Sequence, residues 1–141
     1  MRTLPEVEEA RAVMTEAMGW SVMRWLREKK RVRKMADKAN AALNDLNQAV
    51  KAHWSHEIRT AYIELSQPGS VKRPHVIPAE IRQFVEQVKE ADDQAYRARM
   101  DAERTFDEAE RLLSTSLARE GCRKAIRSWD LHEKAIRRAE A

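Results

Sequence analysis

A heptad pattern of small and apolar residues runs from Ile81 to Ser116 and constrains the fold more than any other stretch of the chain. Two interleaved series make up the pattern: Ile81, Val88, Ala95, Ala102, Ala109 and Ser116, and Phe84, Ala91, Ala98, Thr105 and Leu112. A spacing of seven residues is typical of a helix that lies along another helix. Because most of these positions are alanine, the partner backbone can approach closely. The pattern predicts a structural rod and carries no signature of a reaction.

A second long helix is predicted before this stretch. The segment Thr3-Leu4-Pro5-Glu6 combines an N-cap residue, a proline in the first turn and a capping-box glutamate, which together mark a helix start. The next firm turn signal is Pro68-Gly69, which predicts a loop at 67–77. We therefore expect a single domain with one helix at about 5–66 and another at about 78–141.

Folding the chain at that loop gives an all-α, antiparallel two-helix hairpin that resembles a coiled coil. The charges of the two arms support this pairing, because the acidic segment 6–16 faces the basic segment 119–138. The basic run 24–38 partly faces four acids, Glu103, Asp107, Glu108 and Glu110. Opposite charges across a helix pair set its orientation even though each exposed pair contributes little energy.

Gly121 leaves a second architecture open. If this glycine is a turn, the last 20 residues fold back as a third helix and the chain forms a bundle. The hairpin is our first prediction, because the Gly121-Cys122 connection lacks other turn-forming residues.

Composition narrows the class of protein. Charged residues make up 35% of the chain and apolar residues 43%, with three glycines and four prolines, a profile typical of long helices with charged outer faces. The one cysteine, Cys122, cannot form an internal disulfide and fits best as a small residue of the helix seam. The N-terminus lacks the pattern of a signal peptide, and the longest uncharged apolar run, 17–23, is far shorter than the roughly 20 residues of a membrane span. We expect a cytoplasmic protein.

Motifs for catalysis or cofactor binding are missing from the sequence. It contains no glycine-rich phosphate loop, nucleophile elbow or paired zinc cysteines, so we expect neither an enzyme nor a cofactor. The group His53, His56 and Glu57 supplies metal-ligand types within one helical turn, and the predicted hairpin places acids opposite it. Because such residues are common on charged helix faces, a metal-binding bundle is our third hypothesis and solvated histidines are the favoured interpretation.

The run from Arg24 to Lys38 is the strongest local charge feature. Its candidate nucleic-acid-binding residues are Arg24, Arg27, Lys29, Lys30, Arg31, Arg33 and Lys34. A basic amphipathic helix of this kind can lie on acidic membranes, occupy the groove of a partner or contact the phosphates of nucleic acid. With a net charge of only +4, we favour a solvated face balanced by acids of the other arm, and keep binding to nucleic acid or another acidic surface as the alternative function.

Large apolar residues gather at the end of the rod remote from the loop. The candidate partner-binding residues there are Met14, Met18, Trp20, Met23, Trp25 and Trp129. Two helices cannot bury all of them, so either a third helix or another chain must cover this end. Our first hypothesis is therefore a non-enzymatic interaction or scaffold protein that forms a dimer or docks another helical protein through its Met/Trp-rich end.

Overall fold

The computed structural model describes residues 4–67 and 77–140, and all secondary structure in those ranges is helical. The helices are α1 (Pro5–Ala17), α2 (Val22–Ala52), α3 (His56–Ser66), α4 (Ala79–Leu112) and α5 (Thr115–Glu140). The predicted all-α class is thus confirmed. The predicted loop at 67–77 lies mostly outside the described residues.

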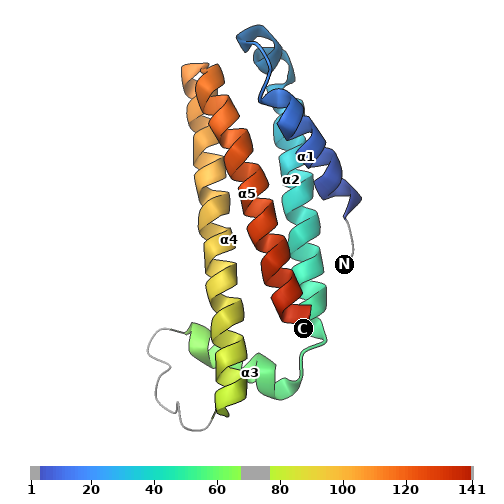
Figure 1. Cartoon of the computed structure of the whole chain (residues 1–141), viewed down its shortest axis with the longest axis vertical. Coiled ribbons are helices and arrows are strands. Elements are labelled where there is room, and N and C mark those ends of the chain that lie inside the picture. The colour runs from blue at the N-terminus through green and yellow to red at the C-terminus, as the bar shows by residue number, and fades with distance from the viewer. Residues whose placement is uncertain (1–3, 68–76, 141) are drawn as a thin grey trace.

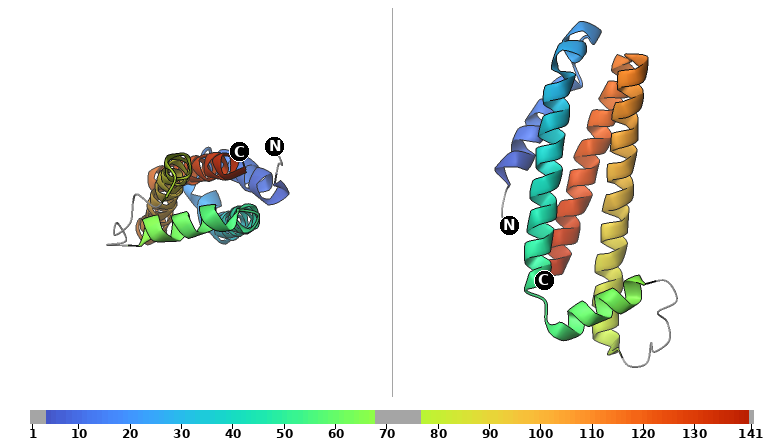
Figure 2. Two further views of the ribbon diagram at one scale, coloured as in Figure 1. Left: turned by 90° about the horizontal axis from the view of Figure 1, so that it is seen from below. Right: turned by 180° about the vertical axis from the view of Figure 1, so that it is seen from behind.

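The helices form an elongated bundle rather than an open rod (Figure 1). The chain rises through α1, returns through α2, crosses the lower end through α3, rises through α4 and descends through α5. Helix α5 packs against both α4 and α2, while α1 packs against α2 and α5 (Figure 2). The two-helix hairpin is not confirmed, because α5 occupies the position between the long arms that the hairpin pairs directly.

Three breaks divide the two predicted arms, and a serine caps the helix that follows each break. Ser21 Oγ accepts a hydrogen bond from the backbone N–H of Arg24, and Ser55 Oγ accepts one from that of Ile58. Ser114 Oγ likewise accepts from a backbone N–H in the first turn of α5. A side-chain acceptor at the N-cap satisfies a donor that the helix itself leaves unpaired. Continuous helices at 5–66 and 78–141 were therefore wrong predictions, and the serines were the missed signal.

The return of the C-terminal segment begins at Leu113 rather than at Gly121. Gly121 lies buried inside α5, so the alternative in which this glycine forms the turn does not occur, although the C-terminal segment does fold back. A Cβ added there would lie 3.1 Å from Cδ1 of Phe106 on α4. The glycine therefore permits close approach of the two helices, a role for which the lack of a side chain is required.

The heptad seam of α4 is largely the buried face that the sequence predicts. Its buried members are Val88, Ala91, Ala95, Ala102, Thr105 and Ala109. Helix α5 presents small residues to the bundle as well, including Ala118, Cys122 and Ala125. The seam ends before Leu112, which is 56% exposed. At the centre of the bundle, Trp129 of α5 is buried and its Nε1 donates to Asn40 Oδ1 of α2 at 3.1 Å.

Ion pairs between helices agree only in part with the predicted charge pairing. Arg33 of α2 contacts Asp107 at 2.9 Å and Glu110 at 3.3 Å on α4, as the basic run was expected to do. Helix α1 meets α5 with the opposite polarity, because its single base, Arg11, contacts two acids of α5, Asp130 at 2.7 Å and Glu133 at 2.9 Å.

Candidate functional site

The structure places most of the Met/Trp-rich end inside the protein. Among the predicted partner-binding residues, four are buried and belong to the core cluster: Met14, Trp20, Trp25 and Trp129. Met18 is partly buried against this cluster. The covering helix that the sequence requires is supplied by the chain itself, because α1 folds back along α2 and α5. These five side chains therefore need no second chain to cover them.

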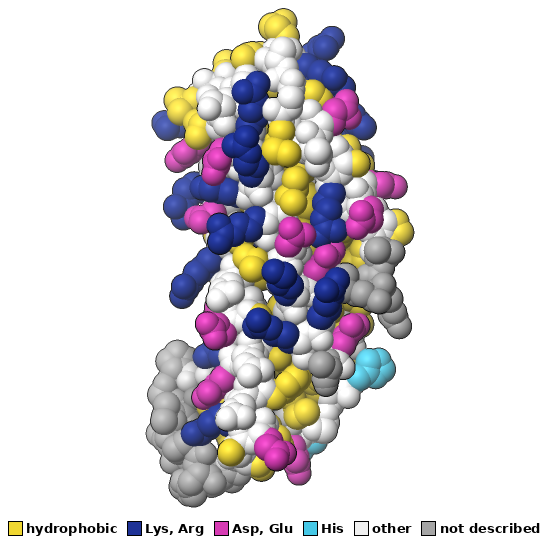
Figure 3. Space-filling view, viewed as in Figure 1, with side chains coloured by type: hydrophobic (Ala, Val, Ile, Leu, Met, Phe, Trp, Pro, Cys, Tyr) yellow, Lys and Arg dark blue, Asp and Glu magenta, His cyan; other side chains and the backbone are white. Residues whose placement is uncertain are grey.

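A smaller apolar surface remains exposed at the same end. Its members are Val22 (43% exposed), Met23 (70%), Leu112 (56%) and Leu113 (50%), and we call it the end surface. The first two follow the α1–α2 turn, and the last two form the α4–α5 turn. Both turns lie at the top of the bundle in Figure 1, and Figure 3 shows hydrophobic side chains there. The end surface thus consists of exposed side chains from both turns at this end of the bundle.

Leu113 has an unusual backbone conformation. Its φ is +52° and its ψ is +38°, the left-handed region, and it is the one non-glycine residue with positive φ among those the structure describes. This conformation costs an L-residue roughly 1–2 kcal/mol, and glycine is the usual choice after a helix. Because the residue is 50% exposed, burial within the protein offsets only part of that cost.

Two buried indole groups lie close to this end. Trp20 and Trp25 pack with ring centroids 6.5 Å apart, and Trp25 stacks on Phe106 of α4 at 6.3 Å. Neither Nε1 atom has a hydrogen-bond acceptor within the described parts of the chain. A buried, unsatisfied donor costs about 1–3 kcal/mol. The indole N–H donors at this end of the bundle therefore lack the pairing found at its centre, where the Trp129 indole has a hydrogen-bond partner.

The candidate basic residues of α2 divide into paired and unpaired sets. Arg24 contacts Glu16 and Glu28 and lies over the Trp20 ring. The hydrogen bond that Arg24 donates to the Glu28 carboxylate contributes most to the raised pKa of Arg24. Arg31 also contacts Glu28, at 3.1 Å, while Arg33 contacts α4. The remaining candidates make no ion pair with any residue that the structure describes: Arg27, Lys29, Lys30 and Lys34.

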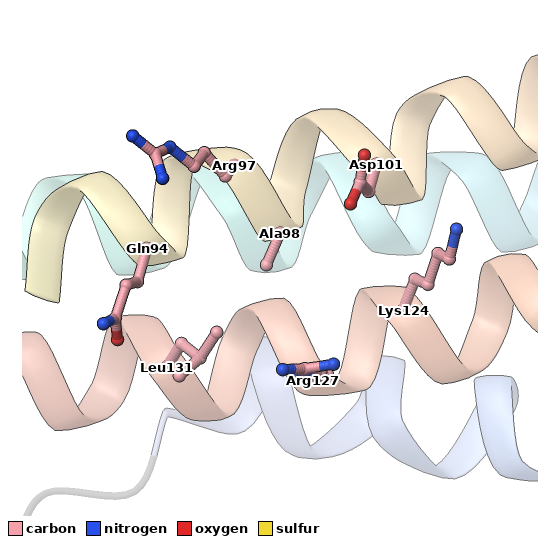
Figure 4. A pocket seen from close by; sticks show the side chains of 7 residues that line it. All are labelled: Gln94, Arg97, Ala98, Asp101, Lys124, Arg127 and Leu131. Carbon is pink, nitrogen blue, oxygen red and sulfur yellow. The ribbon is translucent and has the colours of Figure 1, made fainter.

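A groove of about 430 Å³ runs between α4 and α5 on the face shown in Figure 3. Its lining consists of Gln94, Arg97, Ala98, Asp101, Lys124, Arg127 and Leu131 (Figure 4). The three cations come from both helices, but Asp101 lies among them, and the surrounding face mixes acidic and basic side chains. No signal in the sequence marks this groove, since each of its residues belongs to an ordinary charged helix face.

A polar cluster lies where α2, α3 and α4 meet. Lys51 forms an ion pair with Asp92, and the Tyr62 hydroxyl donates to the same carboxylate at 3.1 Å. Lys51 Nζ also lies 4.5 Å from the centre of the Tyr62 ring. Burial raises the pKa of Tyr62 and lowers that of the nearby His132, so both are neutral at pH 7. These contacts join three helices, and they explain the cluster as part of the fold.

The predicted metal ligands lie apart from any ligand set. His53 caps the end of α2, while His56 and Glu57 begin α3, and all three are exposed. Over 4–67 and 77–140, no group of three or more histidine, cysteine, aspartate or glutamate residues is arranged to hold a metal ion. No helix in those ranges is both long and apolar enough to cross a lipid bilayer.

Cys122 is fully buried in α5, and burial raises the pKa of its thiol to about 12. We expect the native protein to react with thiol reagents at pH 8 only as fast as it unfolds, because the reactive form is the exposed thiolate. The buried thiol should also contribute to the free energy of unfolding below about pH 9. This contribution should be lost as the pH rises toward 12, because the thiol ionises at lower pH in the unfolded protein than in the folded one. Thiol-labelling rates and urea unfolding of Cys122→Ala, which should lack this component, test both statements. Rapid labelling of the folded protein would contradict the first.

Comparisons with protein-family models, with curated proteins and with solved structures found no match for this chain.

Proposed function

We propose that this protein is a non-enzymatic helical docking module that binds a partner protein through its end surface, Val22, Met23, Leu112 and Leu113. The observation that carries the proposal is the strained backbone and the exposure of Leu113. A large apolar side chain there costs backbone strain and remains half exposed, where glycine would satisfy the turn without strain. Residues in sparsely populated backbone regions cluster at functional sites. A contact outside the chain explains why leucine is present.

The partner that fits this surface is a protein with a concave apolar groove bordered by carboxylates. Four partly exposed side chains on a convex tip cannot by themselves supply the roughly 800 Å² that each partner buries in a stable interface, so the partner must wrap around the tip. Three exposed arginines flank the end surface without an ion pair in the described chain, Arg27, Arg111 and Arg119, against one unpaired acid, Glu108. This excess of positive charge favours an acidic rim on the partner.

Site-specific photo-crosslinking in the organism's own cells tests the proposal. Benzoylphenylalanine replaces Met23 in one variant and Ile63 in a control, because Ile63 is also exposed, at 51%, but lies on α3 at the other end. We expect the Met23 probe to capture one defined protein that the Ile63 probe does not. The captured protein, once purified, should bind the wild type at least about tenfold more tightly than the double variant Met23→Ser, Leu112→Ser, because burying each such side chain contributes about 1.5–3 kcal/mol.

Two results would contradict the proposal. Identical products from the two probes would show that the end surface has no specific partner. If the Met23 probe captured only a second copy of this chain, the end surface would mediate self-association and not binding to a different protein.

A further inference from the structure

We propose that the outer face of α2 is a binding site for double-stranded nucleic acid. The site consists of Arg27, Lys30, Arg31, Lys34 and Lys38, which we call the outer stripe. It differs from the end surface in its kind of contact and its ligand, and the two share only Arg27, which borders both.

The helical period places these five residues on one side of α2. Their spacings of three, four and seven residues return to the same helix face, and all five side chains are exposed. Helix α2 packs against α1 and α5 with its opposite face, so its outer face is open in the view from behind (Figure 2). The bundle thus holds the stripe rigid without covering it.

Of the four acids expected on α4 to balance these charges, three pair with cations outside the stripe, and Glu108 makes no ion pair with any described residue. On α4, Asp107 and Glu110 contact Arg33, which lies outside the stripe. Among the described residues, Arg31 is the one member of the stripe with an ion pair, which it forms with Glu28. The exposed acid Asp37 borders the stripe, three residues from Lys34, but makes no ion pair with any residue that the structure describes. Four of the five stripe cations, Arg27, Lys30, Lys34 and Lys38, are therefore without an ion pair among the described residues.

The stripe has the dimensions of a short stretch of duplex backbone. Arg27 and Lys38 are eleven residues apart, which corresponds to about 16 Å along a helix. A duplex strand carries one phosphate per 3.4 Å of axis, so the stripe spans about five phosphates. A straight, rigid row of cations suits the regular backbone of a duplex, and contacts of this kind bind without sequence preference.

Fluorescence anisotropy of a labelled DNA duplex of mixed sequence tests the site. Four phosphate contacts predict a slope of about −4 for log affinity against log salt, so affinity should fall by about 10²-fold between about 50 mM and 200 mM salt. The stripe variant replaces four residues with glutamine: Arg27, Lys30, Lys34 and Lys38. It should bind at least about tenfold more weakly and show a correspondingly shallower salt slope.

A matched control separates the site from net charge. The control variant replaces four cations of the α4–α5 face with glutamine: Arg97, Lys124, Arg127 and Lys134. Both variants lose four positive charges, and circular dichroism should show unchanged helicity in both because all eight residues lie on the surface. We expect the control to bind the duplex within about threefold of the wild type.

Three outcomes would overturn the proposal. The first is no binding of the duplex by the wild type at low salt. The second is equal weakening in the stripe and control variants, which would show a general effect of charge. The third is binding to vesicles of anionic phospholipid that an excess of duplex does not displace, which would assign the stripe to a membrane surface.

Discussion

Replacing Trp129 with alanine is expected to lower the free energy of unfolding by about 3–5 kcal/mol, one of the two largest effects predicted for a single residue of this protein. The indole is 1% exposed and lies where α5 meets α2. Alanine leaves a cavity and removes the hydrogen bond to Asn40. Since a small bundle has only about 5–15 kcal/mol of net stability, much of the native state should be lost on mild heating.

Urea unfolding followed by circular dichroism measures this change. Trp129→Phe is the control, because it keeps an aromatic ring in place and removes the indole donor that Asn40 accepts from. It should cost less than Trp129→Ala, with the remaining loss reflecting the unpaired Asn40 oxygen and the smaller ring. Loss of less than about 1 kcal/mol in Trp129→Ala would contradict the central position of α5 in the bundle.

Replacing Ala10 with glutamate is expected to detach α1 and to cost about 3–5 kcal/mol, the penalty of an uncompensated buried charge. Ala10 is completely buried against the bundle. Displacing α1 should expose the tryptophans beneath it, so tryptophan fluorescence should shift to longer wavelength and a hydrophobic dye should bind.

The same substitution on the other face of α1 provides the control. Ala12 is exposed, so Ala12→Glu should change the free energy of unfolding by no more than about 0.5 kcal/mol. Equal effects of the two substitutions would show that α1 does not cover the Met/Trp-rich end.

The sequence predicted the seam of this fold better than its topology. Small residues at heptad spacing specify a face that another helix can approach, and the buried alanines of α4 confirm that face. The spacing does not say which helix approaches. Any segment with small residues can do so, and here α5 does, with Gly121 and Cys122 buried inside the bundle.

Helix breaks were missed because the capping serines are weak local signals. Serine is common on helix surfaces, and only the chain reversal shows that Ser21 or Ser55 caps a helix. The break at Leu113 has only the weak signal of Ser114, and leucine itself disfavours the left-handed conformation found there.

The candidate sites show the same difference between what the sequence predicts and what depends on the three-dimensional fold. Residue type located the apolar end and the basic run, but exposure decided which members are available to a partner. Met23 is exposed, whereas Trp20 and Trp25 are covered by the reversal of the chain at Gly19. Similarly, Arg33 is engaged in ion pairs across the bundle while Lys34, its neighbour in sequence, faces outward.

The substitution Leu113→Gly separates a structural from a binding role for the end surface. Glycine adopts the left-handed conformation without steric cost, so the free energy of unfolding should stay the same or rise by up to about 1 kcal/mol. Leu113→Asn, which tolerates the same backbone conformation, is a second variant that leaves the turn intact.

The most direct measurement is the yield of crosslinking from the Met23 probe in Leu113→Gly, taken together with the thermal stability of the isolated variant. Docking through the end surface predicts undiminished stability and a fall of at least about tenfold in the captured partner, because a leucine contact is removed only from the complex. A variant that is less stable than the wild type, or one that is equally stable and captures the partner as well as the wild type does, would contradict the assignment of Leu113 to a contact outside the chain.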